Sequence, residues 1–467
     1  MAGLTRRFLG PTASRRRRKK RVILTLCALF VVILAVTTAA LVLPSVSDGA
    51  ETAIEPPPET VLPDPSITPF PESAPMPSSA GLAAALAQVV DDPDLGSFTG
   101  TVADAQTGQV IWSKNPDAPM TPASTTKLLT AAAAMLALPA DHRVTTRVVQ
   151  GSTEGDIVLI AGGDPTLTAL PVGTDGFYPG AARIDDLVEQ IRRSGTVVRS
   201  IGVDTSLYSG DTMAQGWFPA DIAAGSITPI EPIMLDGGRS DPLVDESPRS
   251  TTPALDAGRA LAAGLGVDPA AVTPGTAAEG ADQLASVESA PLRNRLQQMV
   301  YRSDNVLAEA IGRELSLEMD TAASFSGAVA SIGQTLYSAG FEMAGLTLYD
   351  ASGLSVDGRI PARLLDQVLT SAAGNEQPTL RAMLDYLPVA GATGTLSDRY
   401  ASGNRTGAGW VRAKTGTLSA ASALAGYVVD VDGRVLTFAL MSNDRPPGVS
   451  RPALDAVAST LRLCGCQ

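Results

Sequence analysis

The stretch Thr121-Pro-Ala-Ser-Thr-Thr-Lys-Leu-Leu-Thr-Ala-Ala-Ala-Ala-Met-Leu-Ala-Leu138 joins a turn signal to an Ala/Leu-rich run. The run predicts a helix from Ser124 to Leu138. Residues three apart share a helix face, so the amine of Lys127 should lie beside the hydroxyl of Ser124. The positive end of the helix dipole would also favour an alkoxide-like Ser124. A capping serine followed by a surface lysine gives the same short pattern, so this motif needs support from elsewhere in the chain.

Strand patterns lie on both sides of this helix in the sequence. Apolar and polar residues alternate over 97–104 and 110–113, around Gln106-Thr107-Gly108, which predicts a β-hairpin. Near the C-terminus, a terminal helix over 453–461 follows strand signals at 410–413, 423–429 and 434–441. The hairpin and the late strands can share one antiparallel sheet, with the middle of the chain inserted. The predicted fold class is therefore mixed α/β, with a discontinuous main domain.

The middle of the chain has patterns of both kinds. Strands are expected at 143–150, 157–161 and 197–203, and helices at 184–193, 293–315 and 323–338. Residues 235–290 are rich in Gly, Pro, Asp and Ala and predict little.

The first 80 residues form three segments of different composition. Residues 1–21 carry nine basic side chains and no acid, 22–43 are apolar and uncharged, and 44–80 are rich in Pro, Ser, Glu and Thr. The apolar segment is long enough to cross a bilayer, and the basic tail would stay cytoplasmic. A cleaved signal peptide is the alternative, although its apolar core is usually only about 7–15 residues. Either way the rest is exported, with 44–80 as an extended spacer.

Charge and the scarcity of histidine exclude several function classes. Removing the nine basic residues of the tail from the net charge of −13 leaves about −22, which repels phosphate backbones and disfavours nucleic acid. His142 is the only histidine, in a polar turn, so a triad has no imidazole to spare and multi-histidine zinc sites are excluded. No cofactor motif stands out. Cys27 lies in the apolar segment, and the sequence leaves open whether Cys464 and Cys466 form a bridge.

Lysine is rare, and two of its five occurrences lie in suggestive motifs. A buried lysine can become neutral near pH 7, whereas arginine stays charged. Lys127 ends Ser124-Thr-Thr-Lys127. Lys414 begins Lys414-Thr-Gly-Thr417 on a predicted strand, where Gly416 would let a substrate backbone approach closely. Lys414 could hold a carboxylate or lower the pKa of a neighbouring amine, but a solvent-facing strand lysine is equally compatible with this motif alone.

Ser303-Asp304-Asn305 interrupts a helical pattern between these two motifs. A serine and an amide at this spacing can relay a proton and hold a substrate carbonyl, although a capping serine beside a solvated asparagine would look the same. Together the three motifs are the signature of serine β-lactamases and penicillin-binding proteins. Over about residues 81–463 the chain resembles the class C low-molecular-mass penicillin-binding proteins, the D-alanyl-D-alanine carboxypeptidase/endopeptidase family. The resemblance is carried by the following stretches: Pro122-Ala-Ser-Thr-Thr-Lys127, Gly162-Gly-Asp-Pro-Thr-Leu167, Gly216-Trp217, Ser303-Asp-Asn-Val-Leu-Ala-Glu309, Asp350-Ala-Ser-Gly-Leu-Ser355, Leu387-Pro-Val-Ala-Gly391 and Lys414-Thr-Gly-Thr-Leu-Ser419.

The resemblance implies a penicillin-binding/β-lactamase-like transpeptidase domain of residues 81–144 and 286–467, with a second domain, 145–285, inserted. It implies that peptidoglycan stem peptides are the substrates and β-lactams covalent inhibitors, without metal or cofactor. The implied catalytic residues are Ser124 as nucleophile, Lys127 as base, Ser303 as proton relay, Asn305 as peptide holder and Lys414. The implied substrate-binding residues are Thr415, Gly416, Thr417 and Ser419, and the N–H groups of Ser124 and Thr417 would form the oxyanion hole.

The family comparison also identifies one further residue and two departures. In Gly216-Trp-Phe-Pro-Ala-Asp221 the acid falls where the family meets the ammonium of the stem's diamino acid, although a surface acid after a turn is the alternative. Val356 stands where the family has an arginine that reads the stem, and Arg359 could reach that place. A third small domain of larger members should be reduced or absent. Two rival functions remain. One is a β-lactamase, but the E-x-x-L-N signature of those enzymes does not stand out in this sequence. The other is an inactive scaffold.

Overall fold

The computed structural model describes residues 73–466. The predicted tail 1–21, the apolar segment 22–43 and most of the spacer 44–80 lie outside the described residues. Within 73–466, no helix combines the length and apolar character that a membrane crossing needs. The membrane segment therefore stays a prediction from sequence.

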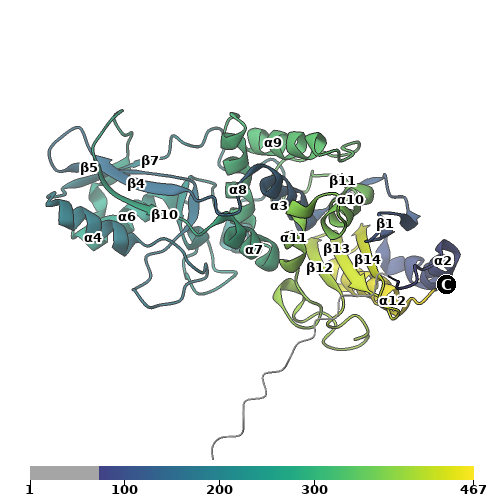
Figure 1. Ribbon diagram of the computed structural model, residues 1–467. Coiled ribbons are helices and arrows are strands. Elements are labelled where there is room, and N and C mark those ends of the chain that lie inside the picture. The colour runs from purple at the N-terminus through teal and green to yellow at the C-terminus, as the bar shows by residue number, and fades with distance from the viewer. Residues whose placement is uncertain (1–72, 467) are drawn as a thin grey trace, which may run out of the picture. The chain divides into compact units, whose positions relative to one another are not determined.

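The main sheet joins the two ends of the described chain. Its strand order is β12-β13-β14-β1-β2, and all four pairings are antiparallel. β1 lies alongside the C-terminal strands, from Ser97 opposite Asn443 to Asp104 opposite Leu436 (Figure 1). The prediction that the hairpin and the late strands share one sheet is confirmed. The strand bounds are β1 Ser97–Asp104, β2 Val110–Lys114, β12 Arg412–Leu418, β13 Ala421–Val429 and β14 Val435–Asn443.

Helices cover both faces of this sheet because its strands alternate their buried side chains. Phe438 and Leu440 of β14 belong to the core that contains α2 and α12, whereas Ala439 and Met441 belong to the core that contains α10. Successive side chains of a strand point to opposite faces, so the two helix layers lie on opposite sides. The helix bounds are α2 Ser79–Val90, α10 Ala362–Ala373 and α12 Pro447–Leu463.

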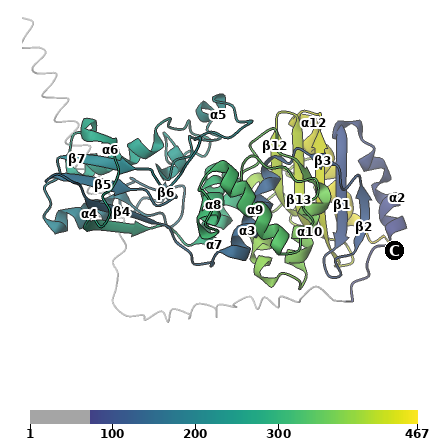
Figure 2. The same ribbon diagram turned by 90° about the horizontal axis from the view of Figure 1, so that it is seen from above.

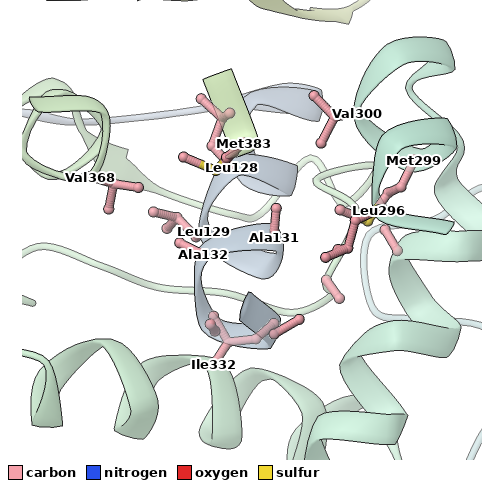
Figure 3. Close-up of a cluster of buried hydrophobic side chains, with 14 of the residues drawn as sticks. Leu128, Leu129, Ala131, Ala132, Leu296, Met299, Val300, Ile332, Val368 and Met383 are labelled. Atoms are coloured by element: carbon pink, nitrogen blue, oxygen red, sulfur yellow. The ribbon is translucent and has the colours of Figure 1, made fainter. Parts of the chain in front are cut away.

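An Ala-rich helix, α3 (Thr126–Ala137), forms the centre of the helical half of this unit. Figure 3 shows Leu128 and Leu129 among side chains of α7, α9, α10 and α11. The side chains of Ala131 to Ala134 are fully buried, and their small size lets neighbouring helices approach closely. This packing fixes the helix that carries Lys127. The neighbouring helices are α7 Leu292–Arg302, α8 Asn305–Glu318, α9 Phe325–Ser338 and α11 Ala382–Asp385.

A second five-stranded sheet, with strand order β10-β4-β5-β7-β9, lies in the predicted inserted region apart from the last residues of β10. Figure 2 shows its strands β4, β5 and β7 with α4 and α6. The sheet has its own apolar core, formed with α4 and α6. β4 and β10 pair beside the predicted boundaries 144/145 and 285/286, which remain predictions. The bounds are β4 Thr145–Gln150, β5 Asp156–Ile160, β7 Ser200–Asp204, β9 Val272–Pro274, β10 Gln283–Glu288, α4 Ile184–Ser194 and α6 Pro253–Leu265. The short elements are β3 Pro119–Met120 paired with β11 Ile360–Pro361, β6 Asp164–Leu167 paired with β8 Ile233–Leu235, and α5 Ala220–Ala223.

Three sequence expectations differ from the structure. Ser124 lies in a 3₁₀ turn, Ala123–Thr125, and the α-helix begins only at Thr126. The late strand expected at 410–413 begins only at Arg412 and runs through the Lys414 motif to Leu418. α2 and α6 were not predicted, because Ala-rich segments flanked by Pro and Gly show little periodicity. The sulfur atoms of Cys464 and Cys466 are joined as a disulfide.

Candidate active site

The turn that carries Ser124 is held by the two threonines that follow it. Thr125 Oγ1 donates to the Pro122 carbonyl at 2.7 Å, and Thr126 Oγ1 donates to the Ala123 carbonyl at 3.0 Å. Ala123 has a φ of 46°, which is uncommon for a residue with a side chain and bends the chain sharply before the helix. Ser124 is thus presented half-buried at the start of α3, where it lines a cavity.

Lys127 Nζ lies at the centre of three contacts. It is 3.0 Å from Ser124 Oγ, 2.6 Å from Asn305 Oδ1 and 2.8 Å from the Ser352 carbonyl oxygen. The side chain is fully buried, and burial lowers its pKa to about 8, although the carboxylates of Asp350, Asp304 and Glu309 act in the opposite direction. The predicted proximity of the amine and the hydroxyl is present.

The segment Ser303–Asn305 links two helices through a sharp bend. α7 ends at Arg302, Ser303 has a left-handed φ of 63°, and the Asp304 carboxylate caps α8 by accepting the Leu307 N–H at 2.9 Å. Asn305 Nδ2 donates to the Ser226 carbonyl at 2.9 Å. That bond fixes which end of the amide is the oxygen, so Oδ1 faces Lys127.

Asp304 is buried and held by two residues of the 145–285 region. Tyr178 donates to its Oδ2 at 2.6 Å, and an Arg239 nitrogen lies 3.4 Å from the same oxygen. Burial acts to raise the pKa of Asp304, but the neighbouring arginines and the hydrogen bonds outweigh it and hold the pKa below its ordinary value. Tyr178, Arg239 and Ser226 had no recognisable motif in the sequence, so they were missed.

Lys414, in β12, is the second buried lysine. Its Nζ lies 2.7 Å from Ser303 Oγ and 2.9 Å from the Thr415 carbonyl oxygen. Burial, with the nearby Lys127, lowers its pKa well below the ordinary value. In the ligand-free protein the stronger reason to be neutral thus lies with Lys414, because three carboxylates support the charge of Lys127. The family resemblance implied Lys127 as the base, a role that needs a neutral amine.

Gly416 is needed for packing of the nucleophile turn. A side chain there would begin 2.5 Å from the Pro122 carbonyl oxygen, so glycine lets β12 approach this turn. The sequence motif predicts that Gly416 leaves room for a substrate backbone. The contacts show that it leaves room for the Pro122 carbonyl oxygen instead. Thr415 Oγ1 shares a hydrogen bond with Thr395 Oγ1 at 2.8 Å, and Thr417 is exposed.

A cavity of about 450 Å³ surrounds these groups. Of the predicted residues, it is lined by Ser124, Ser303, Asn305, Thr415 and Thr417. Lys127 and Lys414 are buried behind it. The remaining lining combines Gly225, Ser226, Thr395, Asp245, Glu246 and Asp304 with five arginines, Arg239, Arg249, Arg302, Arg399 and Arg451.

Three predicted substrate residues, Gly416, Ser419 and Asp221, are not part of the cavity lining. Ser419 is exposed in the turn between β12 and β13. Asp221 lies in α5, where its carboxylate accepts the Phe218 N–H at 3.2 Å. Their roles in substrate binding stay predictions.

The loop 350–355 supplies and positions a carbonyl oxygen that accepts a hydrogen bond from Lys127. Glu309 Oε1 accepts the N–H groups of Ala351 and Ser352 at 3.1 and 2.9 Å, and the Ser352 carbonyl then accepts from Lys127. Asp350 accepts from Trp217 Nε1 at 2.7 Å and also binds backbone N–H groups of the loop. These residues belong to the stretches that carry the family resemblance, but the sequence motifs did not predict that they position Lys127.

Other candidate groups lie outside the cavity. Arg359 donates to the carbonyl oxygens of Val356 and Gly358 at 2.8 and 2.7 Å and does not line the cavity. His142 lies 3.6 Å from Glu314, also away from Ser124. Within residues 73–466, no group of three or more His, Cys, Asp or Glu side chains could hold a metal ion.

Comparison with known sequences gives a match to the D-Ala-D-Ala carboxypeptidase 3 (S13) family over residues 82–248 and 243–462. The chain is 54% identical over 390 residues to a carboxypeptidase of Mycobacterium tuberculosis, covering 83% of this chain and 84% of that protein. It is 50% identical over 432 residues to the carboxypeptidase DacB of Mycolicibacterium smegmatis, covering 92% and 94%.

Solved structures show the same fold at lower identity. Penicillin-binding protein 4 of Haemophilus influenzae superposes with a TM-score of 0.66 at 20% identity, covering 83% of this chain and 98% of that one. A second structure of that protein, in complex with a β-lactam, gives a TM-score of 0.60 at 19% identity, covering 81% and 97%. The mixed α/β, penicillin-binding fold expected from the sequence is thereby confirmed.

Proposed function

The chain belongs to the D-Ala-D-Ala carboxypeptidase 3 (S13) family, and from this premise we propose that it cleaves the D-Ala-D-Ala end of peptidoglycan stem peptides, or their cross-links, through an acyl-enzyme on Ser124. The enzyme is a serine-type hydrolase that works without histidine. Lys127 acts as the base, Ser303 and Lys414 return the proton, and Asn305 holds the peptide.

The coordination of Lys127 carries this proposal. Asn305 Oδ1 and the Ser352 carbonyl can only accept hydrogen bonds. A neutral amine has two N–H groups, and these two oxygens use both of them. Its lone pair is then left for the third neighbour, the hydroxyl of Ser124 at 3.0 Å. After proton transfer the ammonium has three N–H groups for the same three oxygens, so both states are accommodated.

Substrate binding would complete the preparation of the base. A carboxylate placed near Thr415 and Thr417 attracts a proton to Lys414, whose pKa is low only while it is buried without an anion. A charged Lys414 repels charge on Lys127, so the two amines titrate as a coupled pair. The substrate's own carboxylate thereby favours the neutral form of Lys127.

The reaction then proceeds in two balanced steps. Ser124 Oγ transfers its proton to Lys127 Nζ and attacks the penultimate D-Ala carbonyl, with the N–H groups of Ser124 and Thr417 binding the oxyanion. Ser303, which contacts Lys414, gives a proton to the leaving amine as the C–N bond breaks. Ser303 then regains the proton held by Lys127, by way of Lys414. Water then hydrolyses the ester, and Ser124 is restored.

Inhibition and location follow from the same chemistry. A β-lactam carbonyl would acylate Ser124 but leave its amine tethered; a β-lactam complex is known for the Haemophilus protein of the same fold. Peptidoglycan lies in the cell envelope, which is therefore where the enzyme works. We propose that residues 22–43 anchor it there with the basic tail cytoplasmic.

Labelled penicillin followed by peptide mapping tests the nucleophile, and defined muropeptides analysed by mass spectrometry test the reaction. We expect one adduct, on Ser124, and loss of terminal D-Ala or cleavage of cross-links. An adduct on another serine would contradict the assignment. Sustained hydrolysis of nitrocefin would indicate the rival β-lactamase function, and folded protein without any adduct would indicate a scaffold.

A further inference from the structure

The cavity beside Ser124 is rich in positive charge although the protein is acidic. Five arginines but only three carboxylates line it, whereas the chain as a whole carries a net charge of −13. A concave site with one sign of charge attracts ligands of the other sign. The lining therefore favours an anionic ligand.

Three of the five arginines already have partners. Arg239 contacts Asp304 and Asp245, and Arg399 pairs with Asp455. Arg249 donates to two carbonyl oxygens, those of Gly225 and Gly237, at 2.9 and 2.6 Å. These side chains hold the walls of the cavity and have fewer N–H groups left for a ligand.

Arg302 is fixed in place but its charge is not neutralised. Its Nε donates to Gln298 Oε1 at 2.9 Å, and its guanidinium lies 4.3 Å from the centroid of the Phe177 ring. Arg239 contacts the same ring at 3.5 Å, so the aromatic side chain holds both cations. Among residues 73–466, no carboxylate forms an ion pair with Arg302, and no acceptor is bonded to its two terminal nitrogens. This is a pre-organised, bidentate donor beside Ser303.

The positions near Val356 do not offer an equivalent donor. Arg359 was the candidate to replace the family's arginine there. Its guanidinium instead donates to two backbone carbonyl oxygens outside the cavity. Arg451 lines the cavity and its guanidinium has no bonded partner within the described chain, but this side chain is exposed and nothing fixes it. Of the five arginines, Arg302 is thus the one that is held in place and has no acceptor bonded to either terminal nitrogen within the described residues.

We propose that Arg302, oriented by Phe177 and Gln298, is an anion-binding subsite that takes a carboxylate of the peptide substrate. The inference rests on the proposed peptidase function and adds a specificity determinant to it. The carboxylate is either the C-terminal one or one on a side chain of the stem. Both present the same two oxygens to the guanidinium.

Matched peptides separate these sources. The three substrates are a stem peptide with free carboxylates, the same peptide with the side-chain carboxylate amidated, and a form with the C-terminal carboxylate amidated. For the wild type, we expect kcat/KM to fall by about 10- to 100-fold for one amide, the range of a hydrogen bond to a charged group. Arg302→Gln should lower kcat/KM for the acid by that factor. The preference should disappear if the carboxylate is on a side chain, and shrink if it is the C-terminal one, which Lys414 also meets. Arg302→Lys, which keeps a charge but not the fork, should restore part of the preference.

The acid-to-amide ratio distinguishes recognition from damage, because a misfolded site lowers both rates and leaves the ratio unchanged. Arg193→Gln removes one charge from the exposed face of α4 and should leave the ratio at the wild-type value. An unchanged ratio in Arg302→Gln, or loss of the preference only in Arg451→Gln, would overturn the assignment. If the wild type cleaves none of the peptides, the proposed function fails first, and this inference fails with it.

Discussion

Lys127 and Asn305 meet at 2.6 Å although they lie 178 positions apart in the chain. The amide is oriented from its other side by the Ser226 carbonyl, which belongs to the region between the first two motifs. The geometry of the base therefore depends on three distant segments at once. Changes in any of them should alter acylation without touching Ser124.

Replacing Lys127 by arginine should abolish acylation of Ser124. Arginine keeps the charge and much of the reach but cannot accept a proton. Loss of a general base costs about 10²–10⁴-fold or more. Lys414→Arg should keep a measurable fraction, because a fixed cation can still meet the substrate's carboxylate. The measurement is the second-order rate of labelling by penicillin.

Thermal melts of both variants show whether each is folded, since both lysines are fully buried. If folded Lys127→Arg acylates as fast as Lys414→Arg, then Lys127 acts only through its charge and another base must exist.

Acylation should accelerate with rising pH up to about 8. The pKa of Lys127 is lowered by burial to about 8, and only the neutral amine can take the proton of Ser124. Below that pH the neutral fraction rises tenfold per unit, and above it the rate should level off. Stopped-flow acylation from pH 6 to 9 measures this. A rate that falls between pH 6 and 8 is incompatible with a neutral base.

Arg239→Met should destabilise the protein and slow acylation. It removes a buried cation from Asp304, and breaking a buried ion pair costs about 3–5 kcal/mol. Tyr178 still donates to the carboxylate, so the loss should lie near the lower end. Chemical denaturation and penicillin labelling report the two effects.

The double variant Arg239→Met/Asp304→Asn is the control, because it removes both charges of this ion pair. It should be more stable than Arg239→Met alone. Equal instability of both variants would mean that the arginine acts by packing rather than by charge.

Sequence patterns sufficed for the three motifs, the shared sheet and the strand bounds of β1, because each depends on local periodicity or on residue types at fixed spacing. Tyr178, Ser226 and Arg239 could not be predicted in the same way. Each meets the Ser303–Asn305 segment through one polar contact at long sequence separation, and such a contact leaves no periodic trace. Sequence alone also could not predict which of the two lysines has the lower pKa, since that depends on which carboxylates lie nearby.

Asp221→Asn should raise KM for stem peptides and leave penicillin acylation almost unchanged. The carboxylate is proposed to meet the ammonium of the diamino acid, a group that penicillin lacks. Its bond to the Phe218 N–H can be kept by the asparagine oxygen, so the α5 turn should survive. Steady-state kinetics on peptides with and without that ammonium give the comparison. Equal damage to both reactions would point to a structural role.

Asp366→Asn should make stability less dependent on pH. Asp366 is fully buried in α10 against the sheet, its Oδ1 has no hydrogen-bond partner in the described part of the chain, and burial raises its pKa to about 7. Because the folded state holds this proton more tightly than the unfolded chain does, the contribution of Asp366 to stability is highest at low pH and falls as pH rises from about 4 to 7. A shift of this size corresponds to about 4 kcal/mol at most. Asparagine mimics the protonated acid and does not titrate.

Urea unfolding of the wild type and Asp366→Asn at several pH values between 4 and 8 isolates this group, because Glu309, whose pKa burial also raises to about 7, is present in both proteins. The variant should be similar to or less stable than the wild type near pH 4, where the native acid is already neutral. Its relative stability should increase up to pH 7 and then stay constant. A difference between the two proteins that does not change with pH would mean that Asp366 is not the group that loses its proton on unfolding.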